Sequence, residues 1–238
     1  MKKLIVPILC VLAAIGFVAS VYLVFFDAPL EVTINQETGR LEGTSLFFNQ
    51  KIYFFHVAHA ILLFIAVFIA GTSSIMYLWK HDLKWDDIAA GTVDISVAFG
   101  AAVLATGSIW AKAAWDVWWQ WEPRLTMSLL LWLILVGYAL VRKFAGPSAD
   151  RVAAGMAIFG MVGVPFIYTM VGHDSHPASG VNGVVATQAA AMRPAFFVTF
   201  ATFTVWFIVL VITRVQGTRA EREVRELRER GLDLGVIE

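Results

Sequence analysis

Residues 88–141 comprise two apolar runs, IAAGTVDISVAFGAAVLATGSI (88–109) and LTMSLLLWLILVGYALV (125–141), joined by WAKAAWDVWWQWEPR. Each run has the length of a membrane-spanning helix, since about 20 apolar residues cross the hydrocarbon layer. The junction holds five of the nine tryptophans: Trp110, Trp115, Trp118, Trp119 and Trp121. Indole rings gather where one side is apolar and the other polar. We therefore expect these rings to form a flat aromatic platform at a membrane surface, within what we call the tryptophan segment, residues 110–126.

The composition of the whole chain indicates a membrane protein. Of its 238 residues, 59% are hydrophobic and 15% are charged, which is too apolar for a water-soluble globule. Six segments are long enough to cross a bilayer as helices: Leu4 to Phe26, Ile52 to Trp79, Ile88 to Ile109, Leu125 to Val141, Val152 to Val171 and Ala195 to Thr213. We predict an all-α, polytopic membrane protein with six transmembrane helices.

The distribution of Lys and Arg predicts the orientation of these helices. Thirteen of the 18 Lys and Arg residues fall at the two termini and in the loops on the same side, and five fall on the other side. Because positive charge is retained in the cytoplasm, we predict cytoplasmic N- and C-termini. Residues 1–214 then form one transmembrane domain, with the tryptophan segment on the outer face. Residues 215–238 form a charged cytoplasmic tail.

Four of the five histidines are expected on the outer face, beside the tryptophan segment. His56 and His59 lie at the start of the second span, and His173 and His176 lie in the loop between the last two spans. A single histidine in an apolar helix is more often a packing residue than a ligand. Ionisable groups within a membrane, however, are by default candidates for a functional site. Their spacing alone leaves open which of them bind a ligand.

Two histidines on opposite sides of a cleft, next to a broad aromatic surface, suit a planar macrocycle whose iron takes two axial imidazoles. Haem fits this description better than zinc does, because zinc needs three or four close ligands and gains nothing from tryptophans. Arg124 suits a haem propionate, although an interfacial anchor is an equally good interpretation. The chain contains no GxxxxGK[ST] loop, and nothing in it indicates nucleic-acid binding.

The run GSIWAKAAWDVWWQWEPRLT (107–126) resembles the tryptophan-rich WWD segment of the haem-handling proteins of cytochrome c maturation, most closely the CcmC type. The related CcsA type shares this segment but usually has more helices. The resemblance extends to KIYFFHV (51–57), to the outer-loop dipeptide His176-Pro177, to the six spans and to the charged tail. It therefore covers nearly the whole chain.

The resemblance implies that haem, b-type, non-covalent and transient, is held at the periplasmic face of a bacterial inner membrane. Its axial ligands would be His56 and His176, and the rest of the site would be the five tryptophans with Glu122 and Arg124. The family usually has proline after His-Val, whereas this chain has Ala58 and then His59, which leaves a choice of ligand. Glu122-Pro123 replaces the usual Asp, and we expect the platform to end there as a separate short helix.

The function implied is presentation of haem to a periplasmic haem chaperone of the CcmE type for cytochrome c biogenesis. The expected partners are ABC transporter subunits of the CcmA and CcmB types and a small CcmD-type membrane subunit. The chain would be a binding module and not an enzyme. Two alternatives stay open: a haem-bearing membrane oxidoreductase subunit, and a structural subunit of a transporter whose tryptophans only line the membrane interface.

Two smaller predictions concern charged residues on the cytoplasmic side. Asp94 lies in the third span, far from the expected haem, and we predict a role in helix packing or partner contact. The tail carries opposite charges four residues apart, Glu221 with Arg225 and Glu226 with Arg230, as a solvated helix does.

Overall fold

The computed structural model describes residues 2–30, 32–34, 41–43, 47–146, 149–169 and 184–235. Within these residues, six helices are long and apolar enough to cross a membrane, which confirms the all-α prediction with six spans. They are α1 (Lys2–Tyr22, continued by a π-helical turn over Leu23–Asp27), α2 (Ile52–Lys80), α3 (Leu83–Trp115), α4 (Pro123–Phe144), α5 (Ala149–Thr169) and α7 (Arg193–Asp233). The cytoplasmic location of the termini stays a prediction.

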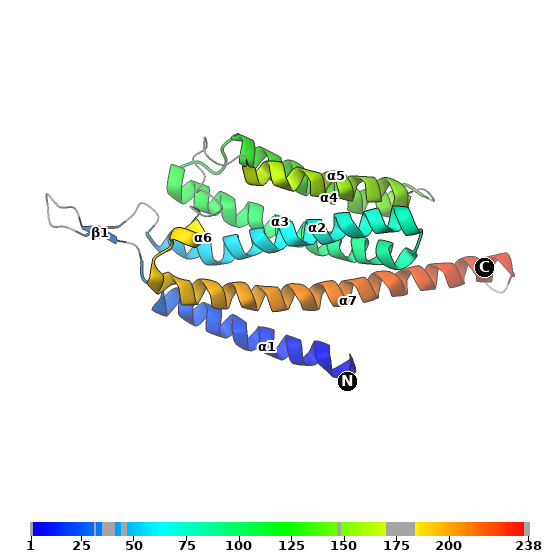
Figure 1. Cartoon of the computed structure of the whole chain (residues 1–238), viewed down its shortest axis with the longest axis horizontal. Helices are drawn as coiled ribbons and strands as arrows, with labels where there is room; N and C mark the ends of the chain where they lie inside the picture. Colours follow the sequence, from blue (N-terminus) through cyan, green and yellow to red (C-terminus); the bar gives the residue numbers. More distant parts are fainter. Residues whose placement is uncertain are drawn as a thin grey trace.

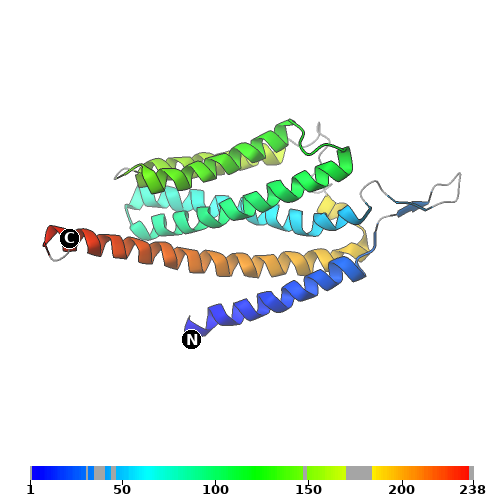
Figure 2. The same cartoon turned by 180° about the vertical axis from the view of Figure 1, so that it is seen from behind.

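The helices lie roughly parallel in successive layers (Figures 1 and 2). The pair α4 and α5 packs on one side of the central pair α2 and α3, and α7 packs on the other side. Helix α1 packs against the outer side of α7 and exposes most of its apolar surface. Helix α7 is continuous across residue 214, so the charged tail extends from a membrane helix and projects past its neighbours (Figure 1).

Short elements connect the spans at the end of the bundle where α2 begins. Strands β1 (Val32–Ile34) and β2 (Leu41–Gly43) pair antiparallel between α1 and α2, an element that the sequence did not predict. A 3-10 turn (Phe47–Lys51) leads into α2, and α6 (Val184–Thr187) with a second 3-10 turn (Ala190–Met192) leads into α7. These elements lie at the end expected to face the periplasm.

Glycines at the helix contacts allow neighbouring helices to pack closely. Lipid tails are as apolar as leucine side chains, so membrane helices associate through packing and polar contacts and not through the hydrophobic effect. A Cβ atom built on Gly91 of α3 would lie 2.8 Å from the Cα of Val215 in α7. On α1, a Cβ on Gly16 would lie 2.5 Å from the Oγ1 of Thr202 in α7. Glycine at these positions allows the helices to approach closely.

We expect the substitution Gly91→Ala to destabilise the protein by about 1–3 kcal/mol, the usual cost of overpacking. The clash is with the backbone of Val215, which no side-chain rotation can relieve, so α3 and α7 must separate. Gly155→Ala on α5 is the matched control, because its Cβ would meet nothing within 4 Å and alanine improves helix propensity. Thermal unfolding in detergent measures both variants, and equal melting temperatures would contradict the prediction.

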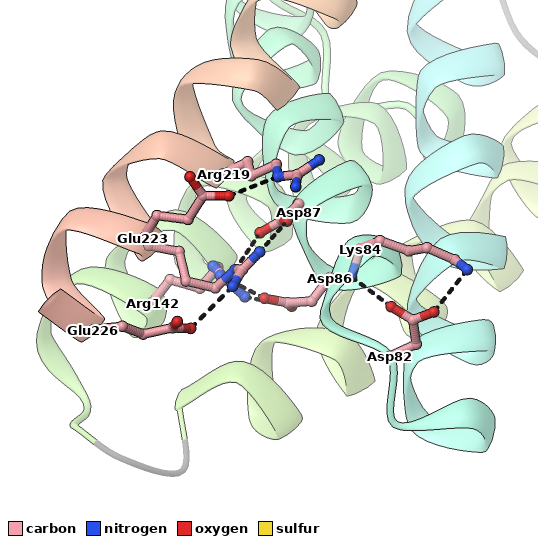
Figure 3. A network of polar contacts seen from close by, with 9 residues as sticks. Asp82, Lys84, Asp86, Asp87, Arg142, Arg219, Glu223 and Glu226 are labelled. Atoms are coloured by element: carbon pink, nitrogen blue, oxygen red, sulfur yellow. Dashed lines mark hydrogen bonds and ion pairs between the residues drawn. The ribbon is translucent and has the colours of Figure 1, made fainter.

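Ion pairs join the helices at the end of the bundle opposite β1 (Figures 1 and 3). Arg142, at the end of α4, donates hydrogen bonds of 2.7 and 2.8 Å to the two carboxylate oxygens of Asp86 in α3. Arg222 of α7 binds Asp87 in the same bidentate way, at 3.0 and 2.9 Å. Asp86 and Asp87 are only 2% and 3% exposed. Sequence reasoning missed both acids, which stand at the polar start of an apolar run.

Asp94 contributes a second ion pair between α3 and α7. Its Oδ2 lies 2.6 Å from the Nε of Arg214, and both side chains are partly buried. The predicted role of Asp94 in helix packing is therefore confirmed. The Asp87–Arg222 and Asp94–Arg214 pairs therefore fix α7 against α3 at two levels of the bundle, and the Asp86–Arg142 pair fixes α4 against α3.

The ion pairs of the tail differ from those predicted. Glu221 pairs with Arg214 at 2.7 Å, and Glu226 pairs with Arg222 at 3.0 Å. The predicted pairs, Glu221 with Arg225 and Glu226 with Arg230, are therefore wrong. Arg214 and Arg222 are already oriented by carboxylates of α3, so they hold the glutamates on the face of α7 that meets α3.

Candidate functional site

His56 lies in the second turn of α2 and faces α3. Its Nδ1 is 2.9 Å from the Oγ1 of Thr106. The next residue of α3, Gly107, leaves space for the ring, since a Cβ there would lie 3.1 Å from the Cε1 of His56. Thr106 precedes Trp110 by four residues, one helical turn on the same face of α3. The α2–α3 contact therefore brings His56 to the edge of the tryptophan segment.

His59 lies one turn further into the bundle and is packed among aromatic rings. Its Nδ1 is 2.7 Å from the carbonyl oxygen of Phe55 in its own helix. Its ring centroid lies 5.0 Å from that of Phe99 in α3 and 4.4 Å from that of Phe203 in α7. These contacts are those of a packing residue at the junction of three helices.

The outer-loop histidines, His173 and His176, lie outside the described residues. The pairing of His176 with His56 therefore stays a prediction. Within the described ranges, no three His, Cys, Asp or Glu side chains are grouped so that they hold a metal ion.

The tryptophan segment combines the end of one helix with an irregular connection. Trp110 and Trp115 lie in the last turns of α3, and Asp116 ends that helix in the left-handed conformation, with φ 59°. Residues 117–122 are not helical, so the separate short helix that we expected is absent from this part of the chain. Pro123 occupies the first turn of α4, as predicted, because it lacks an N–H and its φ suits a helix start.

Lys112 stabilises the end of α3. Its Nζ donates to the Oδ1 of Asp116 at 2.6 Å and to the carbonyl oxygen of the same residue at 3.0 Å. The hydrogen bond from Lys112 holds the pKa of the Asp116 carboxyl below its usual value. Asp116 therefore stays ionised where the chain leaves the helix.

The tryptophan rings do not form the flat platform that we expected. Trp110 and Trp115 meet edge to face, with centroids 5.1 Å apart and planes at 86°. Trp119 and Trp121 do the same, at 6.0 Å and 74°. Edge-to-face packing is favoured because the positive edge of one ring meets the negative face of the next. A planar ligand would therefore meet the faces of some rings and the edges of others.

The rings also differ in their exposure. Trp118 is 61% exposed and Trp121 is 77% exposed, whereas Trp119 is half buried. The side chains of Glu122 and Arg124 are half buried where α4 begins. The exposed rings thus lie at the surface, next to one acidic and one basic residue.

Two features of this end of the molecule, the contacts of His56 and those of Lys51, could not be predicted from the sequence. Thr106 and Gly107 contact His56. The only sequence signal for this contact is that Gly107 belongs to GSIW, the start of the family motif. Lys51 is one of the five basic residues assigned to the outer side, yet it is only 4% exposed. Its Nζ donates to the carbonyl oxygen of Ala28 and so ties the start of α2 to the end of the first span.

Comparison with known proteins identifies the family. The model of the CcmC family, described as heme exporter protein C, matches residues 1–230. The chain is 37% identical over 123 residues to heme exporter protein C of Bradyrhizobium diazoefficiens, covering 49% of this chain and 45% of that protein. It is 32% identical over 131 residues to heme exporter protein C of Escherichia coli K12, covering 52% and 51%.

A cytochrome c biogenesis protein CcsA of Prochlorococcus marinus is 30% identical over 83 residues, covering 35% of this chain and 26% of that protein. The chain thus spans about half the length, or less, of these curated relatives. The family model, by contrast, covers all but the last residues. The chain therefore belongs to the CcmC family.

Proposed function

We propose that the protein binds haem at the periplasmic face of the inner membrane and presents it to a CcmE-type haem chaperone for cytochrome c maturation. The contact of His56 with Thr106, one turn of α3 before Trp110, carries this proposal. It places an imidazole, a common axial ligand of haem iron, beside the aromatic segment. Membership of the CcmC family supports the same function.

The residues present suit haem as a cargo. His56 and His176 would be the two axial ligands, and the exposed rings of Trp118 and Trp121 would contact the macrocycle. Arg124 would pair with a propionate, since guanidinium and carboxylate form strong bidentate hydrogen bonds. The haem would be b-type, non-covalent and transient, because a carrier must release what it collects.

The protein acts, in this proposal, as a handling module and not as an enzyme. Its partners would be ABC transporter subunits of the CcmA and CcmB types and a small CcmD-type subunit, which supply the nucleotide-binding loop that this sequence lacks. The N-terminus and the charged end of α7 lie toward the same end of the bundle (Figure 1). The 13 to 5 distribution of Lys and Arg supports a cytoplasmic location for that end.

Titration of the purified, haem-free protein with hemin in detergent tests the proposal. We expect saturable binding with a six-coordinate, low-spin absorption spectrum, followed by transfer of the haem to an added CcmE-type chaperone. A protein that binds no hemin would contradict haem handling. A haem that is retained through redox cycling and never transferred would favour an oxidoreductase subunit.

Replacing the two exposed tryptophans in the variant Trp118→Ala/Trp121→Ala should weaken hemin binding by roughly ten- to hundredfold. Aromatic contacts contribute about 0.5–1.5 kcal/mol per pair beyond area burial, and both rings are exposed, so the fold should persist. Trp79→Ala is the matched control, because Trp79 is 74% exposed at the opposite end of α2. Similar hemin affinities for the two variants would show that these rings serve only as interfacial anchors.

A further inference from the structure

The hydrogen bonds of Thr106 determine which nitrogen of His56 carries the proton. The Oγ1 of Thr106 lies 2.6 Å from the carbonyl oxygen of Ala102, which only accepts. A hydroxyl has a single proton, and here it is directed to this carbonyl. The contact of 2.9 Å between Oγ1 and the Nδ1 of His56 must then have Nδ1–H as the donor.

This assignment places the lone pair of the neutral imidazole on Nε2. A neutral histidine has one N–H, and the other nitrogen is the acceptor or metal ligand. Histidines that bind metals almost always donate their second ring N–H to a nearby oxygen, which sets the tautomer and the ring orientation. Thr106 provides such an oxygen for His56, from a neighbouring helix.

Gly107 allows the ring to reach this position. A Cβ at residue 107 would lie 3.1 Å from the Cε1 and 3.7 Å from the Nδ1 of His56, so the ring lies directly over the backbone of α3. Glycine is unfavourable within a helix compared with alanine. The close approach of the imidazole gives a physical reason for glycine at this place.

His59 lacks this support from a second helix. Its Nδ1 bonds to the carbonyl oxygen of Phe55 within α2, and its ring is held between Phe99 and Phe203. The two histidines of α2 therefore differ in what surrounds them. His56 is oriented by a hydroxyl from α3 at the edge of the tryptophan segment, and His59 is enclosed by aromatic side chains.

We propose that Thr106 and Gly107 are positioning residues that hold His56 in its Nδ1–H tautomer and orient Nε2 as the ligand for haem iron. This inference rests on the proposed haem-binding function. A hydroxyl is a weaker acceptor than a carboxylate, so it makes the imidazole less electron-rich than a carboxylate partner would. Such a ligand binds iron and still exchanges, as a carrier requires.

Three variants test the proposal: Thr106→Val, which removes the acceptor at nearly constant volume, Thr106→Ser, which keeps it, and Gly107→Ala, which displaces the ring. In haem-free protein labelled with ¹⁵N-histidine, the ¹⁵N NMR shifts of His56 should show Nδ1–H in the native chain and in Thr106→Ser. Thr106→Val should shift His56 toward the Nε2–H tautomer. The His56→Ala variant identifies the signals.

Hemin titration provides the second measurement. Thr106→Val and Gly107→Ala should lower hemin affinity by about 10- to 100-fold, as loss of the group that orients a metal-binding histidine does, whereas Thr106→Ser should stay close to native. Thr204→Val is the matched control for Thr106→Val, because Thr204 also donates to the carbonyl four residues earlier, at 2.8 Å, but on α7. Gly163→Ala, whose Cβ would meet nothing within 4 Å, is the control for Gly107→Ala.

An unchanged His56 tautomer in Thr106→Val would overturn the proposal, even if hemin affinity fell. Loss of hemin affinity in both controls, Thr204→Val and Gly163→Ala, would also overturn the proposal, because the effect would then come from helix packing. The NMR measurement needs no haem, so it decides the role of Thr106 separately from the proposed function. If the native protein bound no hemin while the tautomer followed Thr106, only the haem-binding function would fail.

Discussion

His56→Ala is expected to abolish the six-coordinate, low-spin spectrum of the haem-loaded protein, whereas His59→Ala should preserve it. Removing an axial imidazole leaves an open or water-filled coordination position on the iron. The affinity for hemin should fall by more than about 100-fold, because even the loss of a group that orients a ligand costs about 10- to 100-fold. His59 lies among Phe99 and Phe203, so its loss should affect packing more than ligation.

Both variants should be purified in the same detergent and titrated with hemin at equal protein concentration. The resemblance to the family makes the corresponding prediction for the outer loop, where His176→Ala should lose the low-spin spectrum and His173→Ala should keep it. A spectrum unchanged in His56→Ala but lost in His59→Ala would reverse the assignment. The replacement of the family's proline by Ala58 would then have moved the ligand one turn inward.

Asp86→Ala is expected to cost about 3–5 kcal/mol of stability, the usual effect of breaking a buried ion pair from one side. The substitution leaves the guanidinium of Arg142 partly buried, with the weaker contacts to Asp150 at 3.2 Å and to the ring of Tyr138, whose centroid lies 5.8 Å from Cζ. Unfolding in mixed detergent and SDS micelles, followed by tryptophan fluorescence, measures the change. Glu223→Ala is the control, because its pair with Arg219 is exposed and exposed pairs contribute little.

The double variant Asp86→Ala/Arg142→Ala measures the coupling energy between the two side chains, apart from what each contributes to stability by itself. Removing both charges leaves no uncompensated charge, so the double variant should be less destabilised than the sum of the two single variants. Additive effects of the two substitutions would mean that the ion pair of 2.7 Å contributes no coupling energy. Hemin affinity should change little in all of these variants, because the pair lies at the opposite end of α3 from Thr106.

The membrane helices were predictable because their signal is local. Each run of about 20 apolar residues must satisfy its backbone hydrogen bonds within itself, so composition and length suffice to find it. The helix ends were less predictable. Helix α3 starts at Leu83 and continues to Trp115, past the apolar run at both ends, because polar residues at its ends find partners there, as Asp86 and Lys112 do.

The tertiary structure decided what the side chains contact. The sequence by itself determined the six apolar helices, the proline start of α4, the helical tail and the family. It did not determine that the tryptophans meet edge to face, because ring orientation depends on neighbours in space. Nor did it pair Asp86 with Arg142, 56 residues away.

The choice between His56 and His59 shows the same division. Both residues lie on nearly the same face of α2, and their spacing alone does not choose between them, although the family resemblance selects His56. Only the packing of α3 against α2 sets Thr106 and Gly107 against one ring and Phe99 against the other. Local pattern determines which segments are helices, whereas the hydrogen bonds and space that orient a side chain come from residues distant in the sequence.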